Sequence, residues 1–118
     1  MSISYLKVLA IISLFVGEGF GVYAEIIAAK GSLTAAQPFY IFLKSVLLII
    51  FSAVFLIGGY IMGIRSFHNI WIVSVLSITS ILLIEPVLDY VIFNQIPTQG
   101  AFVGFALAVA GFAATIFF

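Results

Sequence analysis

The four acidic residues of this 118-residue chain all fall inside long apolar stretches: Glu18 and Glu25 in one stretch, and Glu85 and Asp89 in another. A charged side chain at the centre of a bilayer costs roughly 2.5–3.5 kcal/mol on insertion scales, and acids found there usually have a function. A carboxyl group in a low-dielectric cleft can exchange its proton near neutral pH. The pattern therefore predicts reversible protonation that is coupled to moving a solute across a membrane.

The first stretch holds the central candidate for this chemistry. Glu18 and Glu25 are seven residues apart and project from nearly one face of a helix. Gly17, Gly19 and Gly21 surround Glu18, and small residues let a neighbouring helix, a substrate or water approach closely. The pattern predicts that both glutamates bind substrate or protons. For Glu25 the alternative is a pair with a lysine that only fixes helix packing.

Glu85 and Asp89 are four residues apart and also share a helix face. In a four-helix chain the first and third helices run the same way, which puts both residues at a depth similar to that of Glu25, near Lys30 and Lys44. Ion pairing among these groups is the expected arrangement. The alternative is a second substrate site that includes Glu85, such as one for a head group.

Aromatic side chains offer a further way to bind a cation. The ring faces of Tyr23 and Tyr60 are suited to a cation site, and Tyr60 is included among the candidate substrate-binding residues. Anchoring at the lipid interface is the alternative role for tyrosines near helix ends.

These residues must be positioned by membrane-spanning helices. The chain is 65% hydrophobic and 7% charged, whereas soluble domains are about a quarter charged. Its apolar segments are near the ~20 residues that a spanning helix needs, and they do not alternate as barrel strands do. The predicted fold is all-α and integral to the membrane, a single four-helix domain with helices at about residues 5–29, 39–64, 70–93 and 101–118, separated by turns rich in Gly, Pro, Ser and Asn.

Several function classes do not fit this composition. The net charge is zero, which argues against a nucleic-acid partner. The chain has no cysteine and one histidine, so no metal site is expected. No nucleophile–histidine–acid set and no phosphate-binding glycine loop is present, so we expect neither an enzyme nor a cofactor.

Membrane orientation is not set by the basic residues. With four spans, Lys7 and Arg65 lie on one side and Lys30 and Lys44 on the other. This balance fits a topology decided by a partner or by a few residues. It fits equally a chain that inserts both ways and pairs head to tail.

The last third of the chain resembles a known family. Its Leu83-Ile84-Glu85-Pro86-Val87 stretch is followed by a Phe93–Thr98 loop and a glycine-containing helix. This arrangement is similar to the third and fourth helices of the drug/metabolite transporter superfamily. Gly104, Leu107 and Gly111 match the glycine–leucine–glycine dimerisation motif of its small multidrug resistance branch. The resemblance implies a dimer that is held together by these three residues. The alternative is that the small residues of this helix serve packing inside one chain.

The resemblance also implies roles in the first and third helices. Glu18 matches by depth the family's essential glutamate, which binds proton and substrate in competition, and Glu25 is an addition. Ser77 stands where the family carries a tryptophan, and Trp71 is out of register with that position. The fold of the family is therefore implied, and its drug specificity is not.

These observations predict a proton-coupled exporter of a small cationic or amphipathic compound, working as a dimer by alternating access. Its expected partners are membrane lipid, a small-molecule substrate, and a second copy or a related chain. The expected location is the bacterial inner (cell) membrane, in a multi-pass arrangement. Two alternatives remain: a subunit of a flippase for lipid-linked sugars, and a non-transporting accessory subunit of a membrane complex.

Overall fold

The computed structural model describes residues 3–34 and 37–118, and the elements in these ranges are all helices. They are α1 (Ile3–Thr34), α2 (Pro38–Phe67), α3 (Ile70–Phe93) and α4 (Gln99–Phe117). Each is long and apolar enough to cross a membrane. The expectation of an all-α fold with four such helices is confirmed, and the arrangement is that of a multi-pass membrane protein.

Local signals explain where these helices begin and end. Asn69 caps α3 by accepting a hydrogen bond from the Trp71 N–H (2.9 Å), and Thr98 caps α4 by accepting one from the Ala101 N–H (3.1 Å). α2 ends at Phe67 and is capped by His68, whose backbone is left-handed (φ 59°) and whose N–H donates to the Ile64 carbonyl.

The first predicted turn is shorter than the sequence indicated. Residues from Lys30 to Thr34 continue α1, although their composition favours a turn. The reason is tertiary packing: Gly31 is buried, and a Cβ on it would lie 2.6 Å from the Ile41 Cδ1 of α2. Residues 35–36 of the predicted turn lie outside the described residues.

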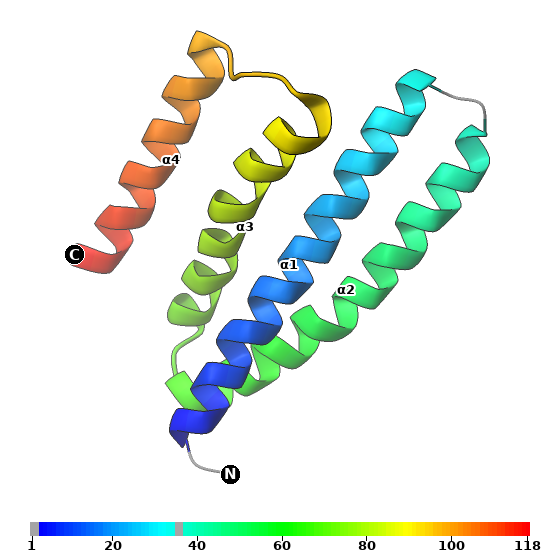
Figure 1. Ribbon diagram of the computed structural model, residues 1–118. Helices are drawn as coiled ribbons and strands as arrows, with labels where there is room; N and C mark the ends of the chain where they lie inside the picture. The colour runs from blue at the N-terminus through cyan, green and yellow to red at the C-terminus, as the bar shows by residue number, and fades with distance from the viewer. Residues whose placement is uncertain (1–2, 35–36) are drawn as a thin grey trace.

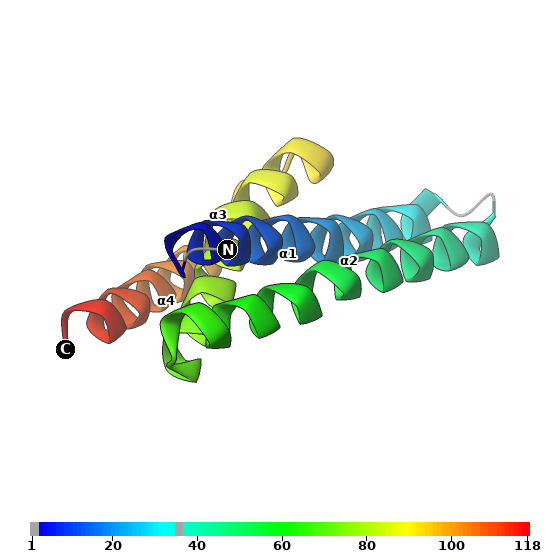
Figure 2. The ribbon, with the colours of Figure 1, turned by 90° about the horizontal axis from the view of Figure 1, so that it is seen from below.

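α1 is the central helix of the bundle (Figure 1). It packs along α2 on one side and α3 on the other, while α4 lies beyond α3 and, within the described part of the chain, contacts α3 alone. α1 and α3 run in the same direction and α2 runs opposite to them. Figure 2 shows the same arrangement from below, with α1 and α2 side by side.

Small residues bring α1 and α2 close together. The buried face of α2 carries a small residue at every seventh position, which makes one continuous stripe: Ser45, Ser52, Gly59 and Ser66. The three serine hydroxyls donate to carbonyl oxygens of their own helix, so their hydrogen-bonding needs are met within α2. The serines therefore act as small side chains that allow close helix packing. We call this contact the α1–α2 seam.

The glycines around Glu18 belong to this packing. A Cβ added to Gly17 would lie 2.8 Å from the Leu56 Cγ of α2, and one added to Gly19 would lie 3.5 Å from the Ile84 Cδ1 of α3. The close approach that these glycines predicted is therefore the approach of neighbouring helices.

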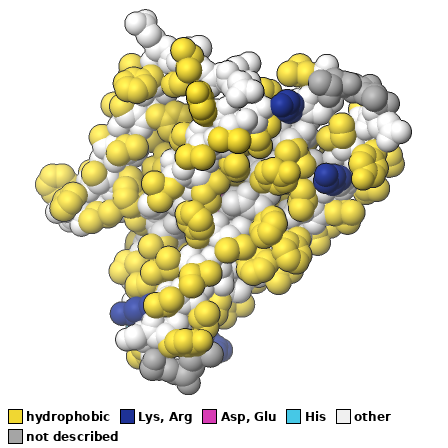
Figure 3. Space-filling model, viewed as in Figure 1, with side chains coloured by type: hydrophobic (Ala, Val, Ile, Leu, Met, Phe, Trp, Pro, Cys, Tyr) yellow, Lys and Arg dark blue, Asp and Glu magenta, His cyan; other side chains and the backbone are white. Residues whose placement is uncertain are grey.

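The outer surface matches a membrane environment. On the face seen in Figure 3, hydrophobic side chains cover most of the molecule, and the Lys and Arg side chains lie toward its two ends. Lys7 is at one of these ends, with its ammonium 5.2 Å from the centre of the Phe67 ring.

Candidate functional site

Glu18 is held at the interface of α1 and α3. Its side chain is partly buried, and its Oε1 accepts a hydrogen bond of 2.5 Å from the Ser77 hydroxyl. Ser77 itself is only 6% exposed. Leu14 on α1 and Val73 on α3, each one turn toward the same end of the bundle, are fully buried. The carboxyl group is thus fixed by a polar partner on a well-packed part of the bundle.

The identity of that partner determines what the carboxyl group can do. A hydroxyl can donate to an ionised carboxylate and can also accept from a protonated carboxyl group. The Glu18–Ser77 contact is therefore compatible with both protonation states. Among the described residues, no Lys or Arg nitrogen lies within 4 Å of an acidic oxygen, so no ion pair holds Glu18 in its charged form.

The other three acids, Glu25, Glu85 and Asp89, lie toward the C-terminal ends of α1 and α3. The carboxyl group of Glu85 is close enough to those of Asp89 and Glu25 to be repelled by each of them when they are charged. These residues therefore lie at a similar level along the bundle, as the parallel course of α1 and α3 predicted. Glu25 is exposed, and Glu85 and Asp89 are partly buried.

The predicted ion pairs with lysine are wrong. The Lys30 ammonium donates instead to the backbone carbonyl of Ile92, at 2.6 Å, and so joins α1 to the last turn of α3. Carbonyls in the last turn of a helix lack an intrahelical donor, which makes Ile92 a ready acceptor. Lys44 is exposed and lies along Tyr40 and Leu47 of its own helix. It points outward because the adjacent Ser45 occupies the buried face of α2.

Tyr60 lies about one to two helical turns from the level of Glu18 along the bundle, and among the described residues no hydrogen bond joins the two. It is partly buried on α2 and follows Gly59, which packs against Leu14 of α1. Leu14 is one helical turn from Glu18. Tyr23 is exposed on α1, as expected of a lipid-facing anchor.

The predicted dimer residues form an open face of α4. A Cβ added to Gly104 or Gly111 would meet nothing within 4 Å, and Leu107 is 68% exposed. Different residues of α4, including Phe102 and Phe105, are directed toward α3. Within the described residues, Gly104, Leu107 and Gly111 therefore do not pack against another part of the chain.

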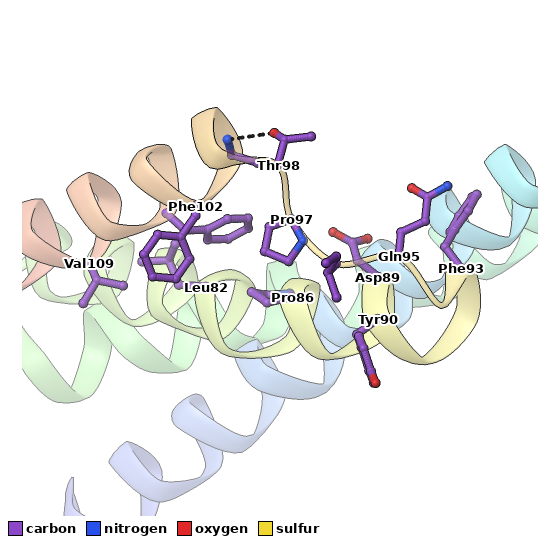
Figure 4. Close-up of a pocket in the computed structure, with 13 residues that line it drawn as sticks. Leu82, Pro86, Asp89, Tyr90, Phe93, Gln95, Pro97, Thr98, Phe102 and Val109 are labelled. Atoms are coloured by element: carbon purple, nitrogen blue, oxygen red, sulfur yellow. Dashed lines mark hydrogen bonds between the residues drawn. The ribbon is translucent and has the colours of Figure 1, made fainter.

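Sequence reasoning missed a cavity between α3 and α4. Its volume is about 660 Å³, and most of its lining is apolar. Figure 4 shows Asp89 at its loop end, near Pro97 and Gln95. The described residues hold no group of three or more His, Cys, Asp or Glu that could hold a metal ion.

No protein family, no curated protein and no solved structure matches the chain. The geometry described above is therefore the basis for a functional proposal.

Proposed function

We propose that the chain is a proton-coupled exporter of a small cationic or amphipathic compound, and that it works as a dimer. The observation that carries the proposal is Glu18: a partly buried carboxyl group in a helix of membrane-spanning length, hydrogen-bonded by the neutral hydroxyl of Ser77. An acid in such a place is rare unless it has a function.

In this mechanism the same carboxyl group binds a proton or the cationic substrate, but not both. When the substrate leaves, Glu18 takes up a proton, and the Ser77 hydroxyl can keep donating to the carbonyl oxygen of the protonated carboxyl group. The absence of a lysine or arginine within 4 Å of Glu18, among the described residues, leaves its charge available to the substrate.

The proposal needs a second copy because four helices enclose little space. α4 lies at the edge of the bundle with no buried residue, and its glycine face is open. Small residues on such a face permit close helix–helix contact in a membrane. Two copies joined by α4 would expose a central site alternately to either side by rocking against each other. The resemblance to the small multidrug resistance branch supports the same arrangement.

The test is transport by the purified chain in proteoliposomes. A pH gradient should drive uptake of a fluorescent organic cation such as ethidium, or of another member of a panel of lipophilic cations. Glu18→Gln should abolish this uptake, whereas Glu18→Asp, which keeps the acid, should retain part of it. Circular dichroism should show equal helicity for all three proteins. Uptake by Glu18→Gln at the parent rate would overturn the proposal and favour a non-transporting role.

A further inference from the structure

The α3–α4 cavity changes in character along its length. Its loop end carries Asp89 and Gln95, and its deeper end is lined by Leu82 and Val109 (Figure 4). A helical rise of 1.5 Å per residue places the Leu82 and Phe93 levels roughly 16 Å apart. The cavity is therefore polar where the chain leaves the membrane-spanning segments and apolar where it is deepest, which matches the way an amphipathic molecule orients in a bilayer.

The charge at the loop end calls for a positive ligand group. Asp89 lines the cavity, and the described residues that line it include no Lys, Arg or His. The nearest acid along α3 is Glu85, whose carboxyl group is close enough to that of Asp89 for the two to repel each other when both are charged. The nearby Lys30 ammonium is bonded to the Ile92 carbonyl rather than to a carboxylate.

A second feature of this wall is a backbone carbonyl without its usual helical donor. Pro86 lies within α3 and lines the cavity together with Leu82, the residue four positions before it. Proline has no N–H, so the Leu82 carbonyl lacks its normal helical donor. Backbone carbonyls at membrane depth need a donor from elsewhere. The Leu82 carbonyl lies seven residues from Asp89, roughly 10 Å of helical rise, so it is an acceptor separate from the carboxylate.

We propose that this cavity binds an amphipathic primary amine. The ammonium group pairs with Asp89, and the apolar chain lies against Leu82, Phe105 and Val109. The volume of about 660 Å³ falls within the range of small-molecule sites, roughly 300–1,000 Å³. A primary ammonium can donate N–H hydrogen bonds to the Asp89 carboxylate, whereas a quaternary ammonium carries the same charge and has no N–H to donate.

Two sources offer this chemistry: a single-chain amine, and a membrane lipid with an ethanolamine head group. The first arm of the test titrates detergent-purified full-length protein with dodecylamine, dodecanol or dodecyltrimethylammonium and measures bound ligand by native mass spectrometry. The second arm compares retention of phosphatidylethanolamine with retention of phosphatidylcholine from nanodiscs. Preference for dodecylamine alone identifies a free amine, and preference for phosphatidylethanolamine identifies the lipid.

In whichever arm shows a preference, the ligand with the primary amine should bind at least tenfold more tightly than its uncharged or trimethylated counterpart. Asp89→Asn should remove this preference, and Asp89→Glu should keep it. Equal binding of primary amine and trimethylated analogue in both arms would overturn the proposal. So would an Asp89→Asn protein with an unchanged preference.

A second pair of variants tests the cavity without changing charge. Ala101 lines the cavity and Ala110 is exposed on α4 outside it. Ala101→Leu should fill the space and reduce amine binding at least fivefold, while Ala110→Leu should not change it. If Asp89→Asn fails to fold, amine binding by these two alanine variants tests the proposal instead. Equal binding by the two would contradict it.

This proposal does not rest on the transport function of Glu18, because Glu18 does not line the cavity. Loss of transport in Glu18→Gln with intact amine selectivity would separate the two sites. Loss of amine selectivity in Glu18→Gln would show that the amine binds at Glu18, and it would contradict the assignment to Asp89.

Discussion

The α1–α2 pair and the α3–α4 pair both join antiparallel helices of similar apolarity, but they meet in different ways. At the α1–α2 seam, small residues bring backbones so close that a Cβ on Gly59 would lie 3.2 Å from the Leu14 nitrogen. Between α3 and α4 bulky residues such as Phe102 and Phe105 line a cavity, and no residue of α4 is buried. Hydropathy alone does not distinguish the two pairs.

The α1–α2 seam is a tightly packed framework, whereas the α3–α4 half has surfaces that are open to binding partners. The seam fixes α1, and α1 in turn presents Glu18 to Ser77 of α3. The α3–α4 half leaves a cavity on one side of α4 and a glycine face on another. A change in the seam should therefore act on stability, and a change in the open half should act on binding or assembly.

The largest expected effect comes from adding one methyl group to a glycine in the seam. Gly59→Ala forces a contact of 2.8 Å with the Leu14 Cδ2 and should lower the free energy of unfolding by about 1–3 kcal/mol. Gly104→Ala meets open space and should be neutral or slightly stabilising, because alanine is the better helix former. Unfolding in mixed detergent micelles measures both. Equal stability of the two variants would mean that the seam is not tightly packed.

A second contrast concerns assembly. Gly104→Leu and Gly111→Leu should each weaken dimer formation at least tenfold, since a bulky side chain holds two α4 helices apart. Gly58→Leu is the matched control, because Gly58 on α2 also has nothing within 4 Å of an added Cβ. Crosslinking and light scattering in detergent report the oligomer. Unchanged dimers in both α4 variants would remove α4 as the contact.

The smallest contrast compares two lysines near the same end of the bundle. Lys30→Met loses the bond to the Ile92 carbonyl and should lower stability by about 1 kcal/mol. Lys44→Met should leave stability unchanged, because Lys44 is exposed and has no acidic partner within 4 Å among the described residues. Thermal unfolding in detergent distinguishes them. A larger loss for Lys44→Met would restore the ion-pair interpretation.

Much of the helical framework could be predicted from the sequence. The apolar segments predicted the four helices, and parallel α1 and α3 placed Glu25 at the depth of Glu85 and Asp89. The seven-residue repeat that begins at Ser45 was also readable and would have predicted the buried face of α2. Ser77 was noticed only as a replacement for tryptophan, because a serine in an apolar helix most often bonds to its own backbone.

The remaining features depend on three-dimensional geometry that side-chain types do not encode. The Lys30 ammonium donates to the backbone carbonyl of Ile92. This partner depends on how far α1 and α3 extend relative to each other. The cavity beside Asp89 depends on the angle between α3 and α4, which is set by the short segment between Phe93 and Gln99. Neither is visible in the pattern of apolar and polar residues.

The most direct test of the transport account is proton release from the purified protein. When a transported organic cation such as ethidium is added to protein in weakly buffered detergent solution, binding should displace a proton from Glu18 and acidify the medium. Glu18→Gln should release none, while Asp89→Asn should still release protons. Absence of release from the parent protein, or equal release from Glu18→Gln, would contradict the claim that substrate and proton compete for this carboxyl group.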